Sequence, residues 1–194
     1  MSSYLKILFL CFSIGSCSFI DFDAPRNMDN ACSILQQRPS FDRAFQKTER
    51  KWGVPIHVQM AILHQESKCI PNAKTPRKYF LGVVPWGRQS SAYGYAQALD
   101  GTWADYKKSS GRRFASRSNI HDASDFMGWY MQESKRWLGI KMSDAKNQYL
   151  AYHEGHGGFK RRSHRKKSWL LDVSDKVARR SNIYKKQLRR CGRA

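Results

Sequence analysis

The chain has 194 residues, which favours a single domain and is long enough to bury a substantial core. A hydrophobic content of 41% and an aromatic content of 13% exclude a disordered protein. The 35 lysines and arginines, against 15 acidic residues, give a formal net charge of +20. Such a charge attracts polyanions, whether nucleic acid, anionic lipid or an acidic wall polymer. The alternative is a basic secreted protein whose charges are simply solvated.

The N-terminal segment has the pattern of a secretion signal. Lys6 precedes an apolar run over residues 7–14, and two small residues then lead to Cys17. A run of this length is too short to span a bilayer as an ordinary helix and fits a signal peptide. Residues 14–17, Ile-Gly-Ser-Cys, resemble a bacterial lipobox, in which the cysteine is lipidated and becomes the mature N-terminus. We therefore expect a lipoprotein signal peptide over residues 1–16 and a lipid anchor at Cys17.

Ser18 follows this cysteine in place of an aspartate, which in enteric-type bacteria indicates sorting to the outer membrane. Several acyl chains would hold the protein far more firmly than one. Residues 17–31 show no clear period and are expected to form a tether, which leaves residues 32–194 as the folded domain. The alternative is ordinary cleavage to a soluble periplasmic protein. Both interpretations place the protein in the cell envelope, on the periplasmic side.

Three cysteines remain after Cys17, and they allow one disulfide and one free thiol in an oxidising compartment. The sequence does not fix the pairing. We expect Cys32 to pair with Cys191, because this bond would tie the start of the domain to its last helix. Closing so long a loop contributes on the order of 4–5 kcal/mol in the loop-entropy model. Cys69 is then expected to be a small buried hydrophobic residue.

Apolar residues recur at helical spacing through most of the remaining chain. Helices are expected from Ser40 through Trp52, from Pro55 to Glu66, from Thr102, from Asp122 to Gly139, from Ser143 to Glu154, and from about Ser168 to Arg190. Ser40 and Ser143 are the expected N-caps of two of them. Residues 71–92 form a long irregular segment, in which only residues 79–84 show a weak strand pattern. The predicted fold class is all-α, with at most a very short β element.

Glu66 comes at the end of a short, mostly apolar helix. A carboxylate in this position is partly stripped of water, and desolvation raises its pKa. A raised pKa suits a general acid that works near neutral pH. The alternative is a solvated residue at a helix end, with no catalytic role.

Two later motifs support the catalytic interpretation. Glu66-Ser67 is followed by the tight loop Gly94-Tyr95-Ala96-Gln97, and later by the helix end Ala151-Tyr152-His153-Glu154-Gly155. In this order the three motifs resemble those of the lytic transglycosylase SLT-domain family, within the superfamily of goose-type lysozyme. The resemblance covers roughly residues 40–159 and implies a lysozyme-like fold.

The resemblance implies a role for each matching residue. Glu66 would be the sole catalytic acid and base, and Ser67 would touch the substrate or help to fix the site. Gly94 would let the backbone approach the sugar closely, because it has no side chain. Gln97 would supply an amide for hydrogen bonding. Tyr152 would donate a hydrogen bond to Glu66 and hold its orientation.

The resemblance also implies the reaction. The family cleaves the β-1,4 bond between N-acetylmuramic acid (MurNAc) and N-acetylglucosamine (GlcNAc), and leaves 1,6-anhydro-MurNAc ends without using water. This chain departs from the family pattern at Tyr95-Ala96, where the family has Leu-Met, and at His153-Glu154, where it has Asn-Ala. Tyr95, His153 and Glu154 are expected at the substrate. Glu154 could instead position a water molecule and turn the enzyme into a hydrolytic muramidase.

The expected partners follow from these features. Peptidoglycan glycan strands are the expected substrate, the lipid anchor would add a membrane, and a complex in the cell envelope remains open. Trp86, Tyr93 and Tyr95 are candidates for stacking on sugars. No histidine spacing matches a structural zinc site, so we expect neither metal nor cofactor. The export signal argues against nucleic acid. A non-catalytic peptidoglycan-binding lipoprotein is the rival from another class.

Overall fold

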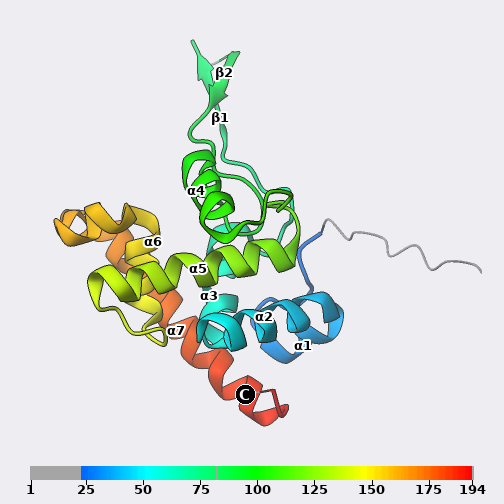
Figure 1. The fold of residues 1–194 in the computed structure, drawn as a ribbon. Coiled ribbons are helices and arrows are strands. Elements are labelled where there is room, and N and C mark those ends of the chain that lie inside the picture. Colours follow the sequence, from blue (N-terminus) through cyan, green and yellow to red (C-terminus); the bar gives the residue numbers. More distant parts are fainter. Residues whose placement is uncertain (1–22, 82, 194) are drawn as a thin grey trace, which may run out of the picture.

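A buried helix lies at the centre of the part of the chain that the computed structural model describes, residues 23–81 and 83–193 (Figure 1). This helix is α3, Ile56–Ser67, and every residue from Ile56 to His64 is buried. It packs against α2, α5, α6 and α7. Buried polar side chains of this helix have partners within the protein; Gln59, for example, donates to the Phe45 and Val54 carbonyls. The proposed signal peptide and Cys17 lie outside the described residues.

The elements surrounding α3 are mostly helical. They are α1 (Ala31–Gln37), α2 (Pro39–Trp52), α4 (Asp100–Ser110), α5 (Ile120–Leu138), α6 (Ala145–Lys160), the 3-10 turn η1 (Ser163–Lys166), α7 (Ser168–Arg190) and the strands β1 (Arg77–Phe80) and β2 (Val84–Arg88). The expected all-α class is confirmed. None of the helices in residues 23–81 and 83–193 is both long and apolar enough to cross a membrane.

Helices α2 and α5 pack closely because α5 carries a glycine at the crossing point. A Cβ atom on Gly128 would lie only 2.3 Å from Cδ1 of Trp52. Beside this contact, the hydroxyls of Thr48 and Ser124 lie 2.7 Å apart, and Ser124 donates to Oε1 of Gln59 at 2.9 Å. Hydrogen-bonded hydroxyls can be buried at little cost. These hydrogen bonds therefore link α2, α3 and α5.

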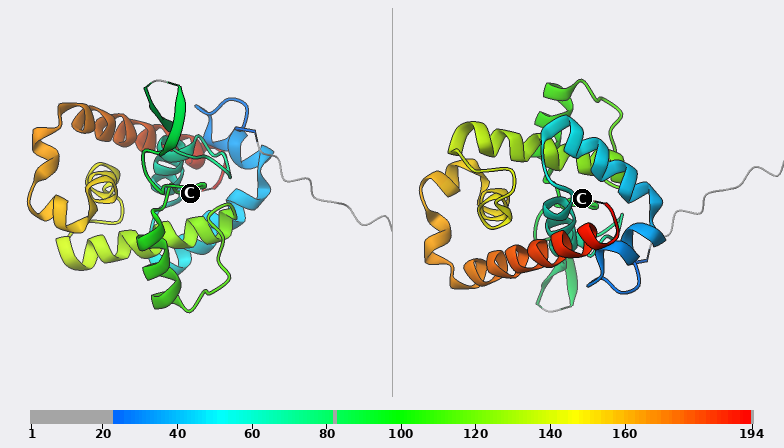
Figure 2. Two further views of the ribbon diagram at one scale, coloured as in Figure 1. Left: turned by 90° about the horizontal axis from the view of Figure 1, so that it is seen from above. Right: turned by 90° about the horizontal axis from the view of Figure 1, so that it is seen from below.

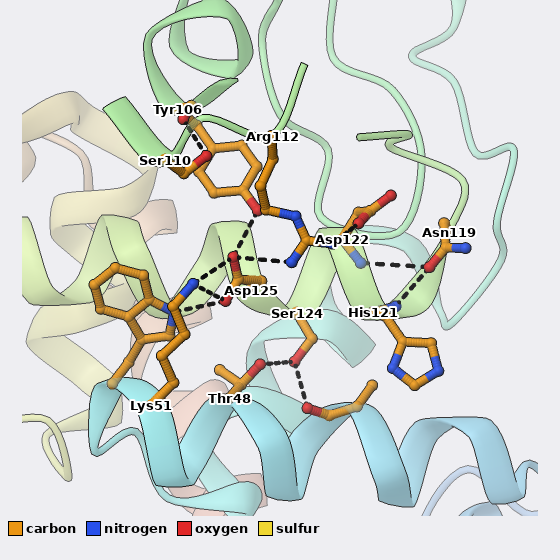
Figure 3. A network of polar contacts seen from close by, with 12 residues as sticks. Thr48, Lys51, Tyr106, Ser110, Arg112, Asn119, His121, Asp122, Ser124 and Asp125 are labelled. Atoms are coloured by element: carbon orange, nitrogen blue, oxygen red, sulfur yellow. Dashed lines mark hydrogen bonds and ion pairs between the residues drawn. The ribbon is translucent and has the colours of Figure 1, made fainter. Parts of the chain in front are cut away.

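Asp125 joins the same pair of helices to α4 (Figure 3). Its carboxylate accepts hydrogen bonds from Lys51 at 2.8 Å, from the Trp52 indole at 2.8 Å and from the Tyr106 hydroxyl at 2.7 Å. Arg112 lies 3.3 Å away on the other side. Although burial alone would raise the pKa of Asp125, its donors hold this pKa below its ordinary value. The ionised carboxylate therefore anchors three segments that are distant in the sequence.

Helix α6 lies between α5 and α7, and Figure 2 shows it almost end-on between them. Gly155 has φ 70° and ψ 157°, so it interrupts the helix directly after Glu154. The expected helix end at this position is therefore a break within a longer element. Residues 156–160 continue helically and lead through η1 into α7.

Both ends of the domain meet at the disulfide between Cys32 and Cys191, the expected pairing. Residues before Cys32 also contact α7: Tyr184 donates to the Met28 carbonyl, and Gln187 donates to the Asp29 carbonyl at 2.9 Å. Helix α1 begins at Ala31, so the expected boundary between residues 31 and 32 lies inside this helix. Cys69 is buried with a free thiol.

Two expected N-caps were wrong by a few residues. Helix α2 begins at Pro39, ahead of Ser40, because proline suits the first helical position. Helix α6 is capped by Asp144, whose carboxylate accepts from the Asn147 amide at 3.0 Å, and not by Ser143. The weak strand pattern over residues 79–84 corresponds to the turn region of the β1–β2 hairpin.

Candidate active site

Glu66 is the penultimate residue of α3, and the chain leaves the helix directly behind it. Lys68 and Cys69 both have left-handed backbone conformations, with φ of 53° and 63°. Burial raises the pKa of Glu66 to about 8, and the charge of Lys68 opposes this rise only in part. The carboxyl group is therefore largely protonated at neutral pH, which a general acid requires.

Two tyrosines of α6 lie close enough to Glu66 for its charge to affect them. The pKa values of Tyr149 and Tyr152 are raised, mainly by burial and in addition by the negative charge of Glu66. The residues are three apart on one helix, so their side chains share a face. The motif in the sequence pointed to Tyr152 alone. Its spacing from Tyr149 is the signal that would have identified the second phenol.

The expected hydrogen bond from Tyr152 to Glu66 needs a correction. The Tyr152 hydroxyl donates instead to the main-chain carbonyl of Ala96. A phenol has one proton to donate, and this contact uses it. Tyr152 therefore joins α6 to the loop at residues 94–97, and it lies near Glu66 without donating to it.

The loop at residues 94–97 is held against the segment that follows α3. The Gly94 amide donates to the Ala73 carbonyl at 2.9 Å. The Gln97 side-chain amide donates to the same carbonyl and to the Gly94 carbonyl, each at 2.9 Å. Gln97 thus supplies its amide protons to the protein itself. Its side-chain oxygen is the atom that this arrangement leaves for a ligand.

The structure gives a different reason from the expected one for a glycine at position 94. Its φ is 78°, and a Cβ atom would lie 2.2 Å from the Arg117 carbonyl oxygen. The glycine therefore permits contact with the protein backbone, where the sequence analysis expected a sugar. The Tyr95 amide donates to the same Arg117 carbonyl at 3.1 Å.

Two further expected substrate contacts are buried. The Ser67 hydroxyl donates to the Leu63 carbonyl at 3.3 Å, one helical turn earlier. The Tyr95 ring is 6% exposed and packs edge-on against Phe41 at 5.4 Å. Both residues support the site from within the core, so a sugar cannot stack on Tyr95 in this structure. Trp86, in contrast, is 74% exposed on the hairpin.

Glu154 is held firmly by its neighbours. Its carboxylate forms an ion pair with Lys167 at 2.7 Å, accepts a hydrogen bond from Ser163 and lies 3.2 Å from Nδ1 of His153. These partners outweigh burial and lower the pKa of Glu154 to about 2, and its side chain is only 4% exposed. Neither Ser163 nor Lys167 was expected at the site, because both lie in the irregular basic segment 160–167, whose course the sequence does not predict.

Four of the expected site residues line one hollow of about 200 Å³ beside α4 and α5; they are Gln97, Tyr152, His153 and Glu154. Phe126 and Tyr130 of α5 form part of its apolar wall. The His153 ring packs edge-on against Trp169 of α7 at 5.2 Å. Since Tyr152 both lines this hollow and lies near Glu66, it connects the acid to the space in which a ligand can bind.

His57 and His64 are uncharged at neutral pH. Burial lowers the pKa values of His57 and His64 to about 4. His57 also lies within hydrogen-bonding distance of the Ser181 hydroxyl, at 2.8 Å. Within the described residues, no three His, Cys, Asp or Glu side chains are grouped as metal ligands would be.

The comparison with known protein families agrees with this geometry. A family model described as Transglycosylase SLT domain matches residues 5–191, nearly the whole chain. No match to a curated protein was found. The family match supports a peptidoglycan-directed function of the lytic transglycosylase type, exercised in the periplasm, and it agrees with the all-α, lysozyme-like fold. The chain therefore belongs to the transglycosylase SLT domain family.

Proposed function

We propose that the protein cleaves the β-1,4 bond between MurNAc and GlcNAc in peptidoglycan and leaves 1,6-anhydro-MurNAc ends. The observation that carries this proposal is Glu66, a carboxyl group at the end of a buried helix with a pKa of about 8. Its surroundings keep the proton on the side chain at neutral pH, so that it can be given to a leaving oxygen.

In the proposed reaction, Glu66 serves first as an acid and then as a base. It donates its proton to the glycosidic oxygen as the bond between that oxygen and C1 of MurNAc breaks. The ionised carboxylate then takes the proton of the MurNAc 6-hydroxyl, and O6 forms a bond to C1. This proton restores the acid form of Glu66, while the first proton stays on the departing GlcNAc oxygen, and no water is consumed. The substrate acetamido group would stabilise C1 between the two steps.

The state of Glu154 supports transglycosylation over hydrolysis. A hydrolase that inverts configuration needs a second carboxylate free to activate water. Glu154 is 4% exposed and bound to Lys167 and Ser163, so its oxygens are already engaged. This favours the route in which a substrate hydroxyl attacks C1.

The place of action belongs to the same proposal. A lipid on Cys17 would hold the domain at the periplasmic side of the outer membrane, within reach of glycan strands. Cys17 lies outside the described residues, so this part depends on the sequence pattern alone.

Product analysis tests the reaction. Purified sacculi are digested with the wild-type chain, with Glu66→Gln and with Glu133→Gln, and the released muropeptides are identified by mass spectrometry. Glu133 makes the matched control, because it is a partly buried carboxylate of α5 that is paired with Arg136 and does not line the hollow. We expect anhydro ends from the wild type and the control, and none from Glu66→Gln. Reducing ends would show a muramidase, and no product from the wild type would contradict an enzymatic function.

A further inference from the structure

The β1–β2 hairpin projects from the helical body, above α4 in Figure 1. Its strands pair in antiparallel fashion, with Arg77 opposite Arg88 and Tyr79 opposite Pro85. Two-stranded hairpins have little stability of their own. A hairpin that projects from the core therefore suggests that its side chains contact a binding partner.

The end of this hairpin is apolar. Residues 79–86, here called the hairpin tip, read Tyr-Phe-Leu-Gly-Val-Val-Pro-Trp and include no charged residue. Tyr79 is 55% exposed, Leu81 81%, Val83 76% and Trp86 74%. Hairpin turns ordinarily carry polar residues, and a run of exposed apolar ones is a liability unless it has a use. Several exposed apolar side chains at one place mark an interaction site.

The base of the hairpin is basic. Lys74, Arg77, Lys78 and Arg88, here called the hairpin stem, are all exposed. No aspartate or glutamate occurs between Glu66 and Asp100, so the hairpin segment contains no acidic residue of its own. Arg77 and Arg88 lie directly opposite each other across the strands. Like charges in this position destabilise a hairpin, and a bound anion would relieve the repulsion.

The distance between the two parts matches a membrane interface. Strand residues are about 3.4 Å apart along the chain, so Lys78 lies roughly 7 Å behind Phe80, where β1 ends before the turn at Leu81. Interfacial protein segments bury their apolar face about 5–10 Å into the boundary between headgroups and acyl chains. When the tip is at this depth, Lys78 is at the level of the lipid phosphates.

We propose that the hairpin tip inserts into the interface of a membrane that contains anionic phospholipid, with the hairpin stem binding the headgroup phosphates. Leu81 and Val83 have no hydrogen-bonding groups, so they suit hydrocarbon. Sugars stack on aromatic rings and need hydrogen-bond donors and acceptors, which the aliphatic turn does not offer. The proposal is independent of Glu66 and of the reaction proposed above. It gives the domain a second membrane contact, apart from any lipid on Cys17.

Vesicle sedimentation tests the apolar contact. All proteins are full chains carrying Cys17→Ser, so that none is lipidated and the N-terminal residues contribute equally. Vesicles contain phosphatidylglycerol with phosphatidylcholine, or phosphatidylcholine alone. We expect Leu81→Ser with Val83→Ser to weaken partitioning into the anionic vesicles about tenfold or more. Phe114→Ser is the matched control, because Phe114 is 100% exposed outside the hairpin, and its binding should equal that of the parent chain.

A charge reversal tests the stem. Lys78→Glu should weaken binding to anionic vesicles about tenfold, since each cation near a charged membrane contributes appreciably. Arg50→Glu makes the same change on α2, an exposed site away from the hairpin, and should bind as the parent does. Binding of the parent chain should also fall as salt is raised.

Hydrogen exchange locates the contact in the same samples. Anionic vesicles should slow amide exchange in residues 77–88 of the parent chain. Unchanged exchange there, or equal binding by the tip variant and Phe114→Ser, would overturn the proposal. So would a tip variant that loses binding to purified sacculi and keeps binding to vesicles, because the hairpin would then be a glycan contact. Loss of activity in Glu66→Gln has no bearing on either result.

Discussion

The hydroxyl of Tyr152 donates a hydrogen bond to the main-chain carbonyl of Ala96, and this bond joins α6 to the loop at residues 94–97. Ala96 is only 2% exposed, so its carbonyl has little access to water once the phenol proton is gone. Tyr152→Phe should therefore lower the free energy of unfolding by about 1–3 kcal/mol. Chemical denaturation measures it, and Tyr79→Phe on the exposed hairpin should change nothing. An unaffected Tyr152→Phe protein would show that the loop is held by other contacts.

The raised pKa of Glu66 predicts the pH dependence of activity. With a pKa of about 8, the protonated acid is lost as the pH rises through that value, so kcat/KM on glycan strands should fall above pH 8. A basic limb that stays flat to pH 9 would contradict the role of Glu66 as the acid.

The same pKa predicts an effect on stability. Between its ordinary pKa of 4.5 and about 8, the unfolded chain ionises Glu66 while the folded chain keeps it protonated. The folded state then binds the additional proton, so stability falls as the pH rises across this range. Glu66→Gln removes this dependence, and it should be more stable than the wild type at pH 8 and similar at pH 4. Thermal melts at the two pH values compare them.

Glu154 should show the opposite sign. Its pKa of about 2 lies below the ordinary value of 4.5, so its ionisation stabilises the fold above pH 4.5. This contribution is lost as the pH falls toward 2. Glu154→Gln should cost about 1–3 kcal/mol at pH 7 through the lost pair with Lys167. Its products should keep anhydro ends, and a loss of all product in a folded variant would assign Glu154 a chemical role.

Gly94 provides a test of the packing under the loop. Gly94→Ala would place a Cβ atom 2.2 Å from the Arg117 carbonyl oxygen, in addition to the strain of a positive φ. Gly139 has a similar φ of 71° with nothing within 4 Å, so Gly139→Ala isolates the strain alone. We expect a cost of about 1 kcal/mol at Gly139 and at least about 3 kcal/mol at Gly94. Equal costs at the two positions would refute the close contact.

The helices that could be predicted from the sequence are those with a strong period. Helices α2, α5 and α7 carry regular apolar faces, and α3 contains the apolar run from Met60 to Leu63, so each was expected nearly where it occurs. Helix α1 was missed, because its seven residues are too few to show a period, although Asn30 caps it. The sequence predicted only one weak strand where the hairpin lies, because the turn of the hairpin is apolar and lacks the usual polar residues.

The site was predictable in its residues and less so in their contacts. The order of the three motifs predicted that Glu66, Gln97 and Tyr152 lie in one region. The partner of each group was beyond the sequence, because a hydrogen bond depends on distances between segments far apart in the chain. Tyr152 thus bonds to Ala96, and Glu154 bonds to Lys167 across a loop without a regular pattern.

The bond between Cys32 and Cys191 closes the domain into a covalent ring whose two ends lie side by side on α1 and α7. A force on the chain before Cys32 therefore acts on α1 and α7 together through the disulfide, and it cannot separate these two helices. If the hollow binds a glycan strand while the N-terminus is anchored, the packed core transmits the tension between the disulfide and the hollow. Because the ring is covalent, the domain can bear a pulling force on its N-terminus while α3 stays folded.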